Sequence, residues 1–565
     1  MDRMGRNRIR AAAAGALLLL LMMLTAAPAC AAKEKTLTAA CPSRCSEIVY
    51  ARKSKNVWVL SLPGFWDPAA VTLELNDSAV ITLGKDGTQF RAGEPGDLTQ
   101  FVGETVTVWD EKQKQACRLI ILQGSPIPAL FLEADGEDVK EIGRSKKKSI
   151  TEGRAAYYEE DGTVSYDGEI EQLKGRGNIT YAYPKKTYQF KLKKKASLSG
   201  MEKAKTWILL ANWTDLSLLR NQIALDMSRA IGLRFAVGCV PVDVWINGNY
   251  NGLYLMTEKI QIGKNRVAIT DLEEETEKVN PSPLNPGKIV KEKKPGFNIF
   301  RSYPAVKDPE DITGGYIATI EKNHRMQNND LPGFRTDEKL LSVQIKEPTY
   351  PSTAQTEYFG GRVLEMHRAL LAKDGVNPET GKSYEEYLDA DSFARKYLIE
   401  DWVKNYDFLG GSQYIYKDSD LVDPLIYAGP AWDYDLAFGN MRDKGHLAAS
   451  PFLANFKKDN NLYWLLYRKD GFRKRLGEIW RTVFRPAAAV LLGEVPAEPG
   501  SIIRPFDEYR AGIEASAAMN FKRWGTNDQA TAYEAGGNFN NATKYLKRWI
   551  KDRTVWMDAN YGTEE

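Results

Sequence analysis

Two carboxylates stand inside an otherwise aromatic and apolar run at residues 429–440, and any fold of this chain must provide for their charge. Asp433 and Asp435 lie two positions apart there, close to Trp432 and Phe438. An ionised carboxylate in apolar surroundings is unfavourable unless a cation or several hydrogen-bond donors compensate it. The run therefore indicates either a bound metal ion or a surface turn with two solvated acids.

The length of the chain and its N-terminus bound the overall organisation. With 565 residues, of which 43% are hydrophobic and 27% charged, the chain is globular and too long for one compact core. Residues 1–32 have a basic start, an apolar stretch and a small-residue end, which is the pattern of a secretory signal peptide. We expect cleavage and a secreted or cell-surface protein. Lipid attachment at Cys30 and an uncleaved N-terminal membrane anchor are the alternatives.

The charge balance disfavours one class of partner. The formal net charge is +3, and the basic N-terminal ten residues account for all of it, so the mature chain is close to neutral. We therefore expect no nucleic acid partner.

The five cysteines suit an oxidising compartment. We expect Cys41 or Cys45 to pair with Cys117 and to staple an N-terminal module. A zinc site is disfavoured, because the whole chain holds three histidines and the Cys41–Cys45 spacing is not that of a zinc knuckle.

Residues 41–125 read as a small all-β module, which we predict to be an Ig-like sandwich with an accessory or binding role. Turn signals such as Pro63-Gly64 and Pro95-Gly96 separate its short apolar runs. The expected strands are 57–62, 71–75, 79–83, 105–109 and 117–122.

Residues 126–565 carry strands first and helices later, which predicts an α+β domain. Asn247-Gly248 is a strong signal for a β-hairpin over residues 240–258. The Glu-, Lys- and Pro-rich residues 271–309 are predicted to be a mobile surface loop, either a substrate lid or a tolerated insertion. Helices are expected over residues 214–231, 353–372, 391–406, 461–484, 505–521 and 542–557.

Asp407 ends one of these helices, and Asp433 and Asp435 follow two short paired strands at 414–416 and 425–427. Three acids at element ends, together with basic residues in the preceding lobe, form a composition suited to phosphoryl transfer. A glycosidase also uses two carboxylates, so the acids alone leave that class open. The basic candidates are Arg176, Lys186 and Lys191, for which a tight turn and solvated strand charges are the simpler explanations.

Further motifs occur in a fixed order: Lys174-Gly-Arg-Gly-Asn178, Lys185-Lys-Thr-Tyr-Gln-Phe-Lys191, Trp207-Ile-Leu-Leu-Ala-Asn212, Arg220-Asn221, Asn247-Gly-Asn-Tyr-Asn-Gly-Leu-Tyr-Leu-Met-Thr-Glu258 and Gly429-Pro-Ala-Trp-Asp-Tyr-Asp-Leu-Ala-Phe-Gly439. With these motifs, the chain from residue 126 to residue 565 resembles the spore-coat protein H (CotH) kinase family. The resemblance covers roughly three quarters of the chain and leaves the N-terminal β module unassigned.

The resemblance implies an atypical, kinase-like two-lobed α+β fold that phosphorylates proteins with ATP and Mg2+. Asp433 and Asp435 fall on the family's metal-binding acids, and Trp432 on an aromatic residue that lies against adenine. Asp407 falls on the acid proposed to be catalytic, beside the attacking hydroxyl.

The resemblance further implies that Lys186 or Lys191 neutralises phosphate charge and that Glu258 orients this lysine. Ser412 and Gln413 stand where a metal-liganding Asn is wanted. The expected function is phosphorylation of Ser or Thr in exported, spore-coat or cell-envelope proteins, with membrane contact only through an N-terminal anchor. The alternatives are an inactive, adhesin-like surface-binding protein and a carbohydrate hydrolase.

Overall fold

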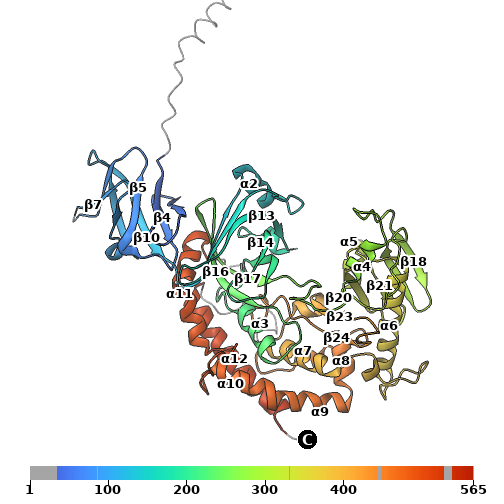
Figure 1. Cartoon of the computed structure of the whole chain (residues 1–565). Coiled ribbons are helices and arrows are strands. Elements are labelled where there is room, and N and C mark those ends of the chain that lie inside the picture. Colours follow the sequence, from blue (N-terminus) through green and yellow to red (C-terminus); the bar gives the residue numbers. More distant parts are fainter. Residues whose placement is uncertain are drawn as a thin grey trace, which may run out of the picture.

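The computed structural model describes residues 35–85, 87–177, 179–329, 331–441, 447–526 and 537–563. The predicted signal peptide and Cys30 lie outside these residues. The fold is mixed α and β: three sheets occupy most of the first three quarters of the chain, and helices dominate its end (Figure 1). None of the helices in the described ranges combines the length and apolar character needed to span a bilayer.

The N-terminal module, residues 35–125, is made of two groups of strands that share one core. One group has the order β2-β1-β5-β8 and the other β3-β4-β10-β9-β6-β7. Buried Leu37 and Leu73 from the first group join buried Leu60 and Leu119 from the second. The strands are β1 (Leu37–Ala40), β2 (Ile48–Tyr50), β3 (Arg52–Ser54), β4 (Val57–Leu62), β5 (Val71–Leu75), β6 (Val80–Leu83), β7 (Thr88–Arg91), β8 (Pro95–Gly96), β9 (Thr105–Trp109) and β10 (Gln115–Gln123).

The predicted disulfide of this module is not formed. Cys41, Cys45 and Cys117 are free thiols, as is Cys239 in the following region. Cys41 and Cys117 are buried as small apolar side chains, while the Cys45 sulfur accepts a hydrogen bond from Trp66 Nε1 at 3.1 Å. The thiols thus contribute to packing in place of a covalent staple.

Seven strands of the next region close into a ring, here called the closed sheet. Its order is β15-β14-β13-β12-β11-β16-β17, and β15 also pairs with β17. Alternate residues such as Leu130, Tyr157, Phe190 and Trp207 are buried and fill one core inside it. The strands are β11 (Ala129–Glu133), β12 (Arg154–Tyr158), β13 (Val164–Arg176), β14 (Thr187–Ala196), β15 (Ala204–Leu210), β16 (Cys239–Ile246) and β17 (Asn249–Glu258).

The predicted hairpin is confirmed, because β16 pairs antiparallel with β17 around Asn247-Gly248. Both turn residues have positive φ, at 49° and 72°, which Asn and Gly tolerate best. The predicted helix before the hairpin is shorter than expected: α3 spans Arg220–Ala230. The Asp215 carboxylate accepts the backbone N–H groups of Ser217 and Arg220, each at 2.9 Å, and so holds the preceding residues in a turn.

The third sheet has the order β18-β19-β21-β22-β20-β23-β24. Its first two strands and helix α4 (Leu272–Lys278) lie within residues 271–309, so the loop predicted there is wrong. β18 is an edge strand whose exposed lysines made it look like a loop, and Gly296, at φ 82°, makes the turn into β19. The strands are β18 (Val290–Lys294), β19 (Phe297–Ser302), β20 (Tyr316–Glu321), β21 (Gly333–Thr336), β22 (Ser342–Glu347), β23 (Gln413–Lys417) and β24 (Ile426–Ala428).

The helices within residues 353–561, called the helical region below, contact the N-terminal module, the closed sheet and the third sheet. Figure 1 shows α9 to α12 along one side of the molecule, from the N-terminal module to the third sheet. α11 contacts both β10 of the module and β17 of the closed sheet. The helices are α2 (Gly136–Arg144), α5 (Asn323–Asn329), α6 (Thr353–Leu371), α7 (Ala390–Val403), α8 (Leu462–Tyr467), α9 (Asp470–Ile479), α10 (Arg485–Leu492), α11 (Phe506–Trp524) and α12 (Phe539–Tyr561).

A buried guanidinium fastens the last helix to the rest of the domain. Arg553 on α12 donates from Nη2 to the Asp401 carboxylate at 3.0 Å and from Nη1 to the Ala448 carbonyl at 2.9 Å. Replacing Arg553 by Met leaves Asp401 buried without its cation, so the free energy of unfolding should fall by about 3–5 kcal/mol. Thermal melting checks this, with Lys551→Met, an exposed cation on the same helix, as the control that leaves the melting temperature unchanged. Equal melting of the two variants would contradict the role of Arg553.

Candidate functional site

Three carboxylates converge where the helical region meets the closed sheet. Asp407 begins a short 3-10 helix (Asp407–Gly410) after α7, and Asp433 and Asp435 lie in the segment after β24. One carboxylate oxygen from each residue lies within 4.8 Å of the others. The antiparallel pairing of β23 with β24, as predicted, carries the chain back to this point. The three residues are called the acidic cluster below.

Asparagine side chains hold the backbone of the cluster. Asn405 Nδ2 donates to the Asp433 carbonyl at 3.0 Å, and Asn405 Oδ1 accepts the Asp407 N–H at 3.1 Å. Asn221 on α3 accepts the Tyr434 N–H at 2.7 Å. Asp433 has a φ of 72°, a conformation that these flanking hydrogen bonds support. The carboxylates are therefore positioned by the protein before any ligand arrives.

Asp435 has one bonded oxygen and one free oxygen. Its Oδ2 accepts the Thr214 hydroxyl at 2.6 Å, which links the cluster to the segment after β15. Its Oδ1 is buried and has no hydrogen-bond donor within the part of the chain that the structure describes. A buried acceptor without a donor is costly, and a bound cation would satisfy it.

The electrostatics of the cluster favour a cation. Burial, together with the charge of a neighbouring acid, raises the pKa of Asp407 and of Asp433 to about 6 and that of Asp435 to about 7. Three mutually repelling carboxylates with an unsatisfied oxygen suit a hard divalent cation such as Mg2+, which prefers oxygen ligands. These side chains therefore fit the metal that the acidic pair predicts.

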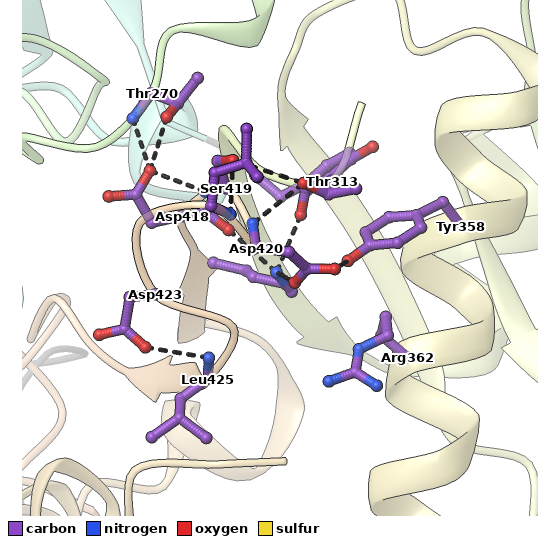
Figure 2. Close-up of polar contacts among 12 residues, drawn as sticks. Thr270, Thr313, Tyr358, Arg362, Asp418, Ser419, Asp420, Asp423 and Leu425 are labelled. Atoms are coloured by element: carbon purple, nitrogen blue, oxygen red, sulfur yellow. Dashed lines mark hydrogen bonds and ion pairs between the residues drawn. The ribbon is translucent and has the colours of Figure 1, made fainter. Parts of the chain in front are cut away.

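In a second acidic loop, by contrast, donors of the chain itself compensate the charge of the carboxylates. Figure 2 shows the loop between β23 and β24, where Thr270 donates its N–H and its hydroxyl to Asp418 and Tyr358 donates to Asp420. The Lys417 ammonium donates to Asp420 at 2.6 Å. Chain donors and a cation thus supply these acids, and a metal ion is not needed there.

Of the predicted basic residues, Arg176 lies at the cluster. Its guanidinium stands over the Trp432 ring, 5.4 Å from the centroid, and its charge offsets part of the increase in the pKa of Asp433 that burial causes. Lys186 instead donates to the Tyr181 carbonyl at 2.9 Å. Lys191 pairs with Glu171 at 2.7 Å and has 43% of its side chain exposed. It projects from the outer face of the closed sheet, because the inward positions of β14 are 188, 190 and 192.

The structure gives Glu258 a different partner from the predicted lysine. Glu258 Oε1 lies 2.7 Å from Arg266 Nη1, and Oε2 accepts the Gly238 N–H at 2.9 Å. The partner of Glu258 is therefore a guanidinium from the loop after β17 and not a lysine of a strand. Nothing in the spacing of Glu258 and Arg266 distinguishes such a loop contact beforehand.

The sequence does not predict several other cations that lie near the cluster. The charges of Lys322, which precedes α5, and of Arg325, within α5, offset part of the increase in the pKa of Asp407. Lys259 and Lys346 are half-buried, and burial, with the charge of Arg176 as a further cause, lowers the pKa of each. Lys259 follows β17 and Lys346 lies in β22, so the convergence of these cations follows from the tertiary fold alone.

Ser412 and Gln413, the positions where a metal-liganding Asn is wanted, make different contacts. The Ser412 hydroxyl donates to Asp433 Oδ2 at 3.2 Å, while Gln413 turns away and donates to the Phe408 carbonyl at 2.6 Å. Asn405, two residues before Asp407, is the amide that reaches the cluster backbone. An Asn-x-Asp pattern is the signal that could have found it.

A cavity of about 310 Å³ lies beside the acidic segment. Pro430, two residues before Trp432, forms part of its wall, with Phe235, Val237 and Ile260 as further apolar lining. Lys259, Lys264 and Arg266 supply cations to the same lining, and Glu202 and Glu258 supply carboxylates. A cavity whose wall is partly apolar and partly charged suits a small ligand that has both kinds of surface.

A comparison with protein families assigns the chain to a family. The family model described as CotH kinase protein matches residues 173–557, which is more than half of the chain. The chain therefore belongs to the CotH kinase family, and membership implies ATP and a divalent metal. No curated protein matches the chain.

The raised pKa values generate a stability test. A carboxyl whose folded pKa exceeds its unfolded value loses stabilising protonation as pH rises through the folded pKa, so the metal-free cluster should weaken the fold between about pH 4 and pH 7. Asp435→Asn removes one charge and keeps an acceptor for Thr214. In EDTA at pH 8 this variant should melt at least about 2 °C above the parent, with a smaller difference at pH 5.

Exposed Asp552→Asn is the control and should leave the melting temperature unchanged at both pH values. Added Mg2+ should raise the melting temperature of the parent at pH 8 and raise that of Asp435→Asn less. If metal-free Asp435→Asn melts below the parent at pH 8, other groups already compensate the repulsion among the three carboxylates, and the prediction fails.

Proposed function

We propose that this chain is an atypical protein kinase that transfers the γ-phosphate of Mg2+-bound ATP to Ser or Thr hydroxyls of exported, spore-coat or cell-envelope proteins. The observation that carries the proposal is the convergence of Asp407, Asp433 and Asp435 with an unsatisfied buried oxygen, in a chain of the CotH kinase family. In this proposal the closed sheet and the helical region act as the two lobes of a kinase-like fold, and the N-terminal module is an Ig-like accessory domain.

The acids have separate tasks. Asp433 and Asp435 hold Mg2+, which when bound neutralises and orients the phosphate oxygens. Asp407 takes the proton of the acceptor hydroxyl as it attacks and so acts as a general base. Asn405 keeps Asp407 and Asp433 in register during this transfer, since it bonds to the backbone of both.

The remaining side chains serve the nucleotide. Trp432 and the apolar part of the cavity wall at Pro430 supply ring and aliphatic surface for the base. Arg176 places a guanidinium against Trp432, and Lys259 and Arg325 add positive charge around the phosphates. Lys191 has no such role in this proposal, because it pairs with Glu171 on the outer face of the closed sheet, and the Lys186 ammonium is engaged by the Tyr181 carbonyl.

The proposed place of action is outside the cytoplasm. The signal peptide predicted over residues 1–32 supports export to the cell surface or the medium, so the acceptor proteins are those of the coat or envelope. Nucleotide is scarce there, and phosphorylation during export or in a sheltered compartment is the corresponding physiological setting.

The acids can be separated by experiment. Asp433→Ala should abolish Mg2+-dependent ATP binding, measured by titration calorimetry, because it removes a metal ligand. Asp407→Asn should reduce turnover by about 100-fold or more and change nucleotide affinity far less, since it removes the base and keeps the shape of the side chain. Transfer of labelled phosphate from ATP to the secreted proteins of the native host gives the turnover.

Asp423→Asn, in the separately compensated β23–β24 loop, is the control and should behave as the parent does. Circular dichroism of each variant excludes unfolding as the cause of lost activity. Parent-like transfer by both Asp433→Ala and Asp407→Asn would refute the assignment of the site.

A second comparison tests the basic residues. Arg176→Gln should weaken nucleotide binding by about tenfold or more, because a charge-assisted contact at the cluster is lost. Lys191→Gln removes the same charge from the outer face of the closed sheet and should leave the affinity unchanged. Calorimetric titration of both variants decides between them, and a larger loss with Lys191→Gln would contradict the structural assignment.

A further inference from the structure

A second, larger cavity, of about 990 Å³, shares no lining residue with the first cavity or with the acidic cluster. It lies at the seam between the N-terminal module and the tip of the β16–β17 hairpin, where Asn247 and Asn249 form one wall. The seam is built on backbone: the Tyr50 N–H donates to the Gly248 carbonyl at 2.9 Å, and Tyr50 pairs with Asn249. Both walls are therefore held in a fixed relation.

The charge of this cavity is of one sign. Its lining has five cationic residues and no carboxylate. Lys35 lies 3.6 Å from the Asp110 carboxylate outside the lining, whereas the other four form no ion pair within the described ranges. Cations gathered on a concave wall raise the local positive potential and attract anions. The cationic residues are Lys35, Arg52, Lys53, Lys55 and Arg118, and the cavity is called the basic cleft below.

The positive surface continues onto helix α11, which Figure 1 shows beside the module. Arg52 Nη1 donates to the Arg523 carbonyl at 3.0 Å, and Lys522 lines a small adjoining cavity with both. Burial and the charge of Arg52 lower the pKa of Arg523 to about 10. Two guanidinium groups thus repel each other here, and an anion would relieve that repulsion.

The uncharged lining adds surfaces for a polyhydroxylated ligand. Tyr50 is 40% exposed, and Trp58 offers a second ring. Asn56, Gln115 and the hairpin asparagines supply amide donors and acceptors. Rings that present an apolar face and amides that bond hydroxyls are the groups that contact sugar rings, while guanidinium and ammonium groups bind carboxylates or phosphates.

We propose that the basic cleft binds an acidic glycan, a polymer of sugar units that carry carboxylate or phosphate groups. A flat bilayer surface does not enter a concave cavity of this size, and the near-neutral charge of the whole chain does not suit nucleic acid. The cleft would hold the molecule on an anionic polymer of the envelope. Binding of the glycan does not depend on kinase activity, whereas its placement at the envelope rests on the export in the proposed function.

Calorimetric titration of the purified chain with short polygalacturonate, which carries carboxylates, and with phosphomannan, which carries phosphates, tests the proposal. At least one should bind, with affinity that falls as salt rises, and neutral dextran should not. The combined substitutions Lys53→Gln, Lys55→Gln and Arg118→Gln should weaken that binding by about tenfold or more. All three side chains are exposed, so thermal melting should remain that of the parent.

The matched control carries Lys85→Gln, Lys112→Gln and Lys114→Gln, which remove three exposed charges from the same module outside the cleft. It should bind the glycan as the parent does. The proposal is overturned if neither glycan binds the parent, or if the two triple variants bind equally. It is also overturned if single-stranded poly(dT) or phosphatidylglycerol vesicles bind through the cleft residues more tightly than either glycan.

Discussion

The repulsion among three carboxylates, of which Asp435 is buried and Asp407 and Asp433 are half-buried, is the constraint on which the candidate site depends. Asp407, Asp433 and Asp435 cannot be brought within 4.8 Å of one another by their own preference, so other contacts must hold them there. Asn405 and Asn221 do so through the backbone, and Thr214 does so through one oxygen of Asp435. The repulsion that remains is what a divalent ion would relieve by coordination.

The same contacts connect the closed sheet and α3 with the segment after β24. Thr214 and Asn221 come from the segment that leaves the closed sheet and from α3, whereas their partners lie after β24. Arg176, at the end of β13, reaches Trp432 in the same way. The acidic cluster is therefore held by residues of both parts. The basic cleft shares no lining residue with the acidic cluster.

The sequence predicted local structure well where the signal was local. β4, β5 and β9 begin and end at the predicted residues, and Asn247-Gly248 forms the predicted turn, because alternation and turn chemistry act over a few residues. The two failures have separate causes. The loop predicted over residues 271–309 contains β18 and β19, because an edge strand needs little apolar surface, and the predicted bond of Cys41 or Cys45 to Cys117 rests on composition alone.

By itself the sequence determined the family and the motif that carries Asp433 and Asp435, since both depend on contiguous residues. Only the tertiary structure decided which cations reach the acids. It brings Arg176 to Trp432 and leaves Lys191 on the outer face, it pairs Glu258 with Arg266, and it gathers Lys259 and Lys346 near Arg176. The reason is physical: a charge acts through space over several ångströms, and distances between elements far apart in the chain depend on how the sheets close and pack.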